Sequence, residues 1–300
     1  MKKLFNLENA KPSFQFLFSL FILLVVFITF TFLGILIALP IFEISFSDFQ
    51  NSKFLEEINF LKYVQTLQTF ALFIIPPFII SYFFGKKTLN FLHFDGKINF
   101  EIFFIACLAM ILSIPLISFL GEINSKLVLP EFLSDLELWM KTSEEKAEEM
   151  IKIFLKSDNL TTLFINILVI AVAPAFGEEL LFRGIFQKIF TNWTKNIHWG
   201  IIISATIFSA FHLQFYGFLP RLLMGIFFGY LLFWSGTIWL PIFAHFINNA
   251  SVTIIYFLVE NKIINMEIEN FENQMIDWKI VLFITFIVYF LIFKIYKKRI

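Results

Sequence analysis

The sequence predicts an all-α fold, a polytopic bundle of about eight transmembrane helices that forms a single membrane domain over residues 1–300. Composition is the first reason. Hydrophobic residues make up 59% of the chain and charged residues only 15%, whereas soluble domains have roughly 45–50% and about 25%. Distribution is the second reason, because the apolar residues are grouped in blocks close to the ~20 residues that a helix needs to cross a bilayer.

Eight apolar stretches are candidate spans. They cover about 14–41, 64–84, 100–120, 160–177, 197–215, 219–236, 238–258 and 278–295. The first is longer than the roughly 7–15 apolar residues of a signal peptide and has no small-residue cleavage site, so we expect it to be retained. We expect the fourth to continue through EELLFRGIFQKIF as one longer helix, with Pro174 and Gly184 as kink points.

The distribution of charge predicts an orientation for the bundle. Basic residues flank the links that an even number of spans places on one side, and acidic residues gather in the opposite loops. By the positive-inside rule, we expect cytoplasmic N- and C-termini in a multi-pass protein of the cell membrane. The basic residues are Lys2, Lys3, Lys11, Lys86, Lys87, Lys97, Arg183, Lys188, Lys195, Lys294, Lys297, Lys298 and Arg299, and the acidic residues are Glu43, Asp48, Glu56, Glu57, Glu260, Glu267, Glu269, Glu272 and Asp277.

The segment 121–159 differs from the spans around it. Its sequence WMKTSEEKAEEMIKIFLKS mixes apolar residues with acids and lysines, which predicts an amphipathic helix at the membrane interface or over a cavity. Thr142 or Ser143 is the expected N-cap of this helix. The pattern fits both a solvated connection and a lid that contacts the substrate.

Two features exclude other classes of protein or site. The formal net charge is zero, so nothing predicts a nucleic-acid partner. The single cysteine, Cys107, can form neither an internal disulfide nor a Cys/His zinc site by itself.

Three groups of polar residues lie inside the late spans, where a charged group costs at least a few kcal/mol and is usually paired or functional. The first group is Glu178, Glu179 and Arg183. At 100° per residue, Glu179 and Arg183 lie about 40° apart and one turn from each other, so they can form an ion pair. Glu178 lies about 140° from Arg183, so we expect it to be unpaired and suited to general acid–base chemistry. A charged helix end at the cytoplasmic interface is the alternative interpretation.

The second and third groups contain imidazoles and amides. His212 follows Phe208 by one helical turn in SATIFSAFHLQFYG, and His245 and Asn249 share a helix face in LPIFAHFINNASV, with Asn248 beside them. Interface anchoring for His212 and interhelical hydrogen bonds for the third group are the alternatives. The three groups together contain the side chains that a hydrolase needs. A carboxylate can take a proton from water, and imidazole and amide N–H groups can stabilise the developing oxyanion.

These ordered motifs resemble a known family. Glu-Glu-x-x-x-Arg, Phe-x-x-x-His and His-x-x-x-Asn, each in a late span, are similar to the motifs of the CAAX prenyl protease and bacteriocin-processing (Abi) family of intramembrane glutamic endopeptidases. The resemblance covers about Leu160 to Leu258 and implies that 160–258 is the catalytic core of a membrane-embedded endopeptidase. It further implies that Glu178 activates the attacking water, that His212 assists, and that His245 and Asn249 form the oxyanion hole. Glu179, Arg183, Phe208 and Asn248 would support these residues.

The expected substrate is a peptide or a membrane-anchored protein reached from the lipid bilayer, and the expected reaction needs no cofactor. One alternative is a zinc-dependent membrane metalloprotease that uses Glu178, Glu179, His212 and His245. No His-Glu-x-x-His motif is present, and Asn249 fits only the glutamate mechanism. A non-catalytic bacteriocin-immunity or membrane scaffold protein of the same fold is a further alternative. A transporter is disfavoured because the sequence lacks two-half symmetry.

Overall fold

The computed structural model describes residues 6–45, 48, 57–85, 87–264 and 277–299, and within these ranges the chain forms helices and connections without a strand. Seven helical stretches of the described chain are long and apolar enough to cross a membrane, and α11 (Ile197–Phe211) is a shorter apolar helix. The seven are α1 (Pro12–Ile41), Ile58–Phe84, α6 (Phe100–Ser125), Leu160–Thr194, α12 (Phe218–Ser235), α13 (Trp239–Glu260) and α15 (Trp278–Lys297). The predicted all-α membrane bundle is therefore confirmed.

The second of these stretches is divided into three helical segments, and short helices lie between the long ones. Ile58–Phe84 contains α3 (Ile58–Thr69), the π-helical η2 (Phe70–Ile74) and α4 (Ile75–Phe84), followed by the short α5 (Thr88–Phe91). After α6 come η3 (Glu131–Leu133) and α7 (Ser134–Leu155). Lys2, Lys3, Glu56, Lys86, Glu267, Glu269 and Glu272, which contribute to the predicted orientation, lie outside the described residues.

The fourth span is one continuous helix of 35 residues, as predicted. It consists of α8 (Leu160–Asn166), η4 (Ile167–Val172), α9 (Ala173–Glu179), η5 (Leu180–Phe186) and α10 (Gln187–Thr194), so two π-helical stretches interrupt it. Pro174 lies two residues after the end of the first and Gly184 within the second. Proline cannot donate to the carbonyl four residues earlier, and a wider π-turn accommodates that missing bond. Because the helix continues past residue 177, Glu178 lies near its middle rather than at its end.

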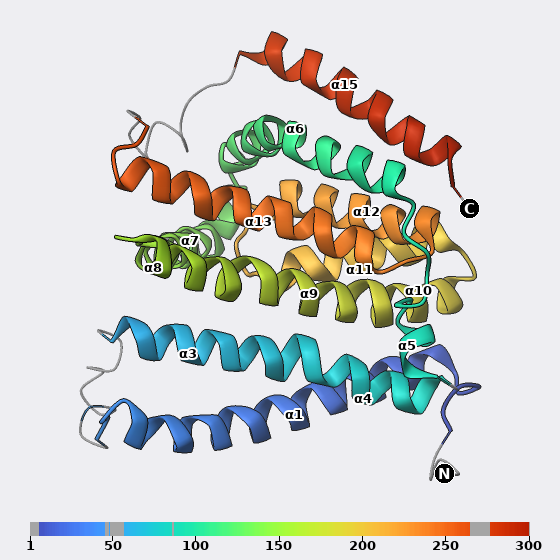
Figure 1. Cartoon of the computed structure of the whole chain (residues 1–300), viewed down its shortest axis with the longest axis horizontal. Helices are drawn as coiled ribbons and strands as arrows, with labels where there is room; N and C mark the ends of the chain where they lie inside the picture. The colour runs from blue at the N-terminus through green and yellow to red at the C-terminus, as the bar shows by residue number, and fades with distance from the viewer. Residues whose placement is uncertain (1–5, 46–47, 49–56, 86, 265–276, 300) are drawn as a thin grey trace.

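The fourth span is central in the bundle. Figure 1 shows α9 and α10 between the layer of α1, α3 and α4 and the layer of α11, α12 and α13, with α6 and α15 beyond. The main apolar core forms where these layers meet, from buried residues such as Phe84, Leu181, Phe182, Phe208 and Leu232. Polar groups on α9 therefore face neighbouring helices instead of lipid.

Small residues let the helices approach closely around the fourth span. A Cβ at Gly177 would lie 2.7 Å from the Cβ of Phe73 in η2, and a Cβ at Gly225 would lie 2.9 Å from the Cβ of Ala205. Larger side chains at these positions would force α9 away from η2 and α12 away from α11. The spacing of Gly225 and Gly229 on one face of α12 thus fixes where its backbone carbonyls lie relative to α9–α10.

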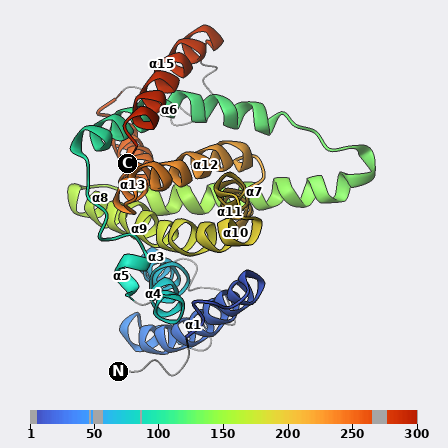
Figure 2. The same ribbon diagram turned by 90° about the vertical axis from the view of Figure 1, so that its right-hand side faces the viewer.

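Helix α7 lies across one end of the bundle. It is seen nearly end-on in Figure 1 and lengthwise in Figure 2, where its first turns project beyond the bundle. It begins at Ser134, so the predicted N-cap at Thr142 or Ser143 is wrong. Residues 136–141 are mostly good helix formers, and Thr142 donates from Oγ1 to the carbonyl of Leu138 inside the helix. The helix in 121–159 is confirmed, and its location at a membrane interface stays a prediction.

Candidate active site

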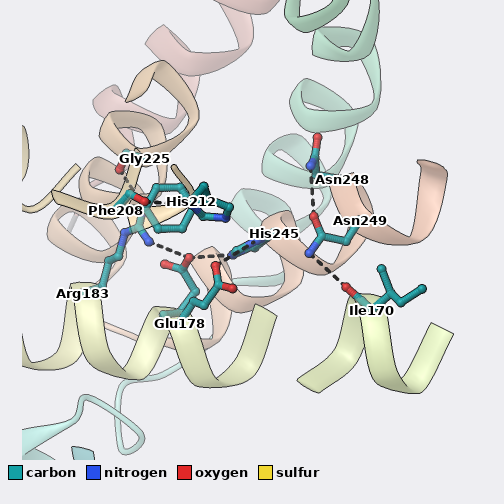
Figure 3. A network of polar contacts seen from close by, with 10 residues as sticks. Ile170, Glu178, Arg183, Phe208, His212, Gly225, His245, Asn248 and Asn249 are labelled. Atoms are coloured by element: carbon teal, nitrogen blue, oxygen red, sulfur yellow. Dashed lines mark hydrogen bonds and ion pairs between the residues drawn. The ribbon is translucent and has the colours of Figure 1, made fainter. Parts of the chain in front are cut away.

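The centre of the site is a buried carboxylate with two partners. Glu179, which is 0% exposed, accepts hydrogen bonds at Oε1 from Arg183 Nη1 at 2.7 Å and from His245 Nδ1 at 2.8 Å. The expected ion pair of Glu179 with Arg183 is thus present, one helical turn apart. The sequence did not predict the second partner, which links α9 to α13 (Figure 3).

Arg183 is held on all sides. It is 2% exposed, donates from Nη2 to the carbonyl of Gly225 at 3.0 Å, and lies over the rings of Phe208 at 4.7 Å and Phe228 at 5.3 Å. Aromatic faces attract a guanidinium, most strongly when both are desolvated. Phe208 therefore supports the site by contacting Arg183, while Gly225 and Phe228 are contributors that the motifs did not reveal.

His245 lies between the two adjacent glutamates. Its Nδ1 faces Glu179, and its Nε2 lies 3.9 Å from Glu178 Oε2. An ionised carboxylate only accepts hydrogen bonds, so the bond to Glu179 assigns a proton to Nδ1. The ring is stacked on Phe228 at 5.1 Å and meets the edge of Phe208 at 5.9 Å. Both contacts fix the plane of the imidazole, so Nε2 is aimed at Glu178.

Glu178 is in a different environment from Glu179. It is 9% exposed, and its Oε2 atom is buried and accepts no hydrogen bond from the described residues. It lines a pocket of about 610 Å³ together with His212, Arg221 and Asn249, and α7 contributes apolar side chains to the same pocket. The two neighbouring carboxylates are therefore separated as the helical geometry predicts: Glu179 is paired at Oε1 with Arg183 and His245, and Glu178 faces a cavity.

His212 ends α11 and enters the pocket with a defined tautomer. Its Nδ1 lies 2.9 Å from the carbonyl oxygen of Phe208, and a carbonyl can only accept, so Nδ1 carries a proton. In the neutral ring, Nε2 is then a hydrogen-bond acceptor. His212 and Glu178 line one cavity even though they come from different helices, because the long fourth span carries Glu178 to the depth of His212.

Asn249 is oriented by two contacts. Its Nδ2 donates to the carbonyl of Ile170 at 3.3 Å, and its Oδ1 accepts from Asn248 Nδ2 at 3.1 Å. Pro174, four residues after Ile170, has no N–H to give to that carbonyl, which leaves it available to Asn249. An amide NH2 has two donor hydrogens, so one remains for a ligand in the pocket. The contact between Asn249 and Ile170 joins α13 to η4, which the spacing of the motifs could not reveal.

Among the described residues, no group of three His, Cys, Asp or Glu side chains is arranged to hold a metal ion. The imidazole of His245 is committed at Nδ1 to Glu179, and that of His212 is committed at Nδ1 to a backbone carbonyl. Each ring therefore offers only Nε2 to a ligand.

Comparison with known proteins adds to this geometry. The segment from α8 to the middle of α13 matches the family described as type II CAAX prenyl endopeptidase Rce1-like. The match covers residues 160–251, called the Rce1-like segment below. This match confirms the resemblance drawn from the motifs, and all eight predicted site and supporting residues lie within the Rce1-like segment. Together with the seven long apolar helices, it supports a multi-pass membrane protein.

One curated relative also matches the chain. It is the uncharacterized protein YpbD of Bacillus subtilis, 30% identical over 103 residues, which are 33% of this chain and 47% of that protein. The chain thus spans about half the length of the curated relative that it matches. No solved structure matches the chain significantly.

Proposed function

We propose that this protein is an intramembrane endopeptidase of the CAAX-processing type, which hydrolyses a peptide bond with water activated by Glu178. The observation that carries the proposal is the position of Glu178. Its carboxylate is buried, has an oxygen without a hydrogen-bond partner among the described residues, and lines one pocket with an imidazole and a carboxamide. The Rce1-like segment includes all of these residues.

The proposed reaction begins with a water molecule bound between Glu178 and His212. Glu178 accepts a proton as the water oxygen attacks the scissile carbonyl, and the unprotonated Nε2 of His212 can accept the second hydrogen bond of that water. The protonated Glu178 then gives the proton to the leaving amine. Water is added across the bond, and the carboxylate is regenerated.

The oxyanion formed by this attack needs donors. The remaining N–H of Asn249 is one donor, and its direction is fixed by Ile170 and Asn248. His245 donates from Nε2 only when it is protonated, because Glu179 already receives its Nδ1–H. Glu179 and Arg183 therefore act as positioning residues that hold His245 and do not touch the substrate.

We further propose that the protein lies in the cell membrane with both termini cytoplasmic, and that it cleaves a peptide or a membrane-anchored protein. Figure 1 shows α1 beginning and α15 ending at the end of the bundle opposite α7. With this orientation, α7 and the pocket beneath it face the non-cytoplasmic side. Ala147, Ile151 and Phe154 of α7 line the pocket, which suits contact between this helix and the substrate.

The test is comparative proteomics of membrane fractions from cells that contain the wild-type protein, Glu178→Gln or Glu149→Gln. Glu149 is exposed on α7 and has the same side chain outside the pocket, which makes it the matched control. We expect new N-termini or C-termini with the wild type and the control that are missing with Glu178→Gln. Identical peptide profiles for all three proteins would leave a non-catalytic scaffold as the better description. Because the proposed reaction uses no metal, hydrolysis should persist after treatment with a chelator.

A further inference from the structure

An arginine side chain lines the candidate active-site pocket, and the proposed reaction does not use it. Arg221 is in the first turn of α12 and lines the pocket with Glu178, His212 and Asn249. Gly225 lies one turn after Arg221 in the same helix, and its carbonyl accepts a hydrogen bond from Arg183. An arginine inside a predicted span is costly and is usually paired or functional, so its partners decide how to interpret it.

The hydrogen bonds of Arg221 go to neutral groups. Nη1 donates to the carbonyl of Gln214 at 3.0 Å, and Nη2 donates to the side-chain oxygen of the same residue. No carboxylate of the described residues lies within 4.0 Å of its guanidinium, whereas Arg183 has Glu179 at 2.7 Å. Glu144 and Glu178 interact with Arg221 electrostatically from greater distances. Arg183 is therefore neutralised inside the protein, and Arg221 is not.

The surrounding backbone makes room for this side chain. A Cβ at Gly217 would lie 2.5 Å from Nη1 of Arg221 and 2.6 Å from its Cζ, so a glycine is needed for the guanidinium to lie against the loop. Gln214, which accepts both hydrogen bonds from the Arg221 guanidinium, also lines the pocket. A guanidinium has five N–H donors, and the two bonds to Gln214 leave others for a ligand.

We propose that Arg221 binds a carboxylate of the substrate next to the scissile bond, and that it selects substrates with such a group. The carboxylate is either the C-terminal carboxylate of the chain or an acidic side chain. This inference rests on the proposed function. Arg221 can form a bidentate, charge-assisted pair with a carboxylate, and the apolar side chains of α7 over the pocket would exclude water from it. Binding energy gained at this site would position the peptide bond over Glu178.

An alternative role for Arg221 is to anchor the 212–217 loop, which begins at His212. Gln214→Ala separates the two roles, because it removes one contact of the loop but leaves the positive charge. Arg221→Gln removes the charge, and Arg221→Lys keeps it without the two-pronged geometry. If anchoring is the only role, Gln214→Ala and Arg221→Gln should affect all substrates to a similar extent, whatever the charge of the substrate.

The experiment uses two pairs of fluorescent apolar peptides with one common sequence. The first pair ends in a carboxylate or a carboxamide, and the second carries an internal Glu or Gln with an amidated end. Binding is measured by fluorescence anisotropy to the purified full-length protein carrying Glu178→Gln, alone and combined with each of Arg221→Gln, Arg221→Lys and Gln214→Ala. Hydrolysis is measured with the same peptides and proteins that keep Glu178.

We expect one carboxylate peptide to bind at least about tenfold more tightly than its amide, which is the scale of a charge-assisted hydrogen bond. Arg221→Gln should abolish that preference, Arg221→Lys should retain part of it, and Gln214→Ala should preserve it. The pair that shows the preference identifies the source of the carboxylate. Equal binding of both members of each pair, or no binding, overturns the inference. Carboxylate-dependent binding without hydrolysis would overturn the protease proposal alone, and hydrolysis without a charge preference would overturn the inference alone.

Discussion

Glu179 Oε1 lies 2.8 Å from His245 Nδ1, so the fully buried carboxylate of α9 determines which nitrogen of the α13 imidazole carries a proton. The same oxygen also receives Arg183, and the next residue back along the helix, Glu178, faces the other ring nitrogen. Two adjacent glutamates thus have separate tasks. Glu179 is part of the internal support, and Glu178 is the group that faces the pocket.

The first prediction concerns these two glutamates. Glu179→Gln leaves the buried charge of Arg183 without its ion-pair partner, so we expect a loss of about 3–5 kcal/mol of stability, the usual cost of breaking a buried pair. Glu178→Gln removes a carboxylate oxygen that has no hydrogen-bond partner in the described chain, so it should leave stability unchanged or raise it. Thermal unfolding of the purified variants in detergent measures both effects. Equal melting temperatures for the two variants would contradict the division of roles.

The second prediction concerns Pro174. In Pro174→Ala the new N–H can donate to the carbonyl of Ile170, which then competes with Asn249 Nδ2 for that acceptor. We expect kcat to fall about tenfold or more, on the scale of a lost oxyanion donor, while the helix becomes no less stable. Hydrolysis rates and circular dichroism measure the two properties. Pro76→Ala, in α4 outside the site, is the control, and an unchanged kcat in Pro174→Ala would refute the role of the proline.

The third prediction concerns the attachment of α7. Burial raises the pKa of Glu144 above the ordinary 4.5, partly offset by the backbone N–H of Tyr216, which donates to its Oε2. A carboxyl with a raised pKa in the docked helix favours docking when it is protonated. The docked position should therefore weaken as pH rises from 4.5 through the raised pKa. Amide hydrogen exchange of α7, corrected for intrinsic rates, should show less protection at the higher pH, and Glu144→Gln should remove this dependence. A pH response that Glu144→Gln leaves intact would be evidence against it, with Glu148→Gln as the control.

The fourth prediction concerns orientation. In a Cys107→Ser background, a single cysteine at Glu149 of α7 should react with a membrane-impermeant maleimide added outside intact cells. A cysteine at the exposed Asn192 in α10 should react only after the cells are opened, because it lies toward the opposite end of the bundle. The reverse pattern of labelling would place α7 and the pocket on the cytoplasmic side.

Much of the fold could be predicted because the length and hydropathy of a segment indicate whether it can span a membrane as a helix. Each of the eight predicted spans contains a helix, although the fifth helix, α11, ends at Phe211 and is shorter than the other seven. The extension of the fourth span past Glu178 is confirmed by the helix Leu160–Thr194. The predicted N-cap of α7, Thr142 or Ser143, lies nine or ten residues after the observed N-cap, Leu133, because the sequence before Thr142 continues the helix. Capping preference is a weak signal inside a segment that is helical on both sides.

The candidate site was only partly predictable. Helical spacing gave the pair of Glu179 and Arg183, since both residues belong to one helix. Spacing could not reveal contacts between helices, such as His245 with Glu179 or Arg183 with the carbonyl of Gly225. Those contacts depend on the register of α9, α12 and α13, which is set by close packing at small residues. Arg221 was missed because it belongs to none of the three motifs.

The most direct measurement is peptide-bond hydrolysis by the purified protein in proteoliposomes. The substrate is a pool of peptides prepared from membrane proteins, and mass spectrometry detects new termini. With Glu178 as the group that activates water, the wild-type protein and Glu149→Gln should generate the same new termini, and Glu178→Gln should lose them by at least about a hundredfold in rate. Cleavage by Glu178→Gln at the wild-type rate would contradict this mechanism.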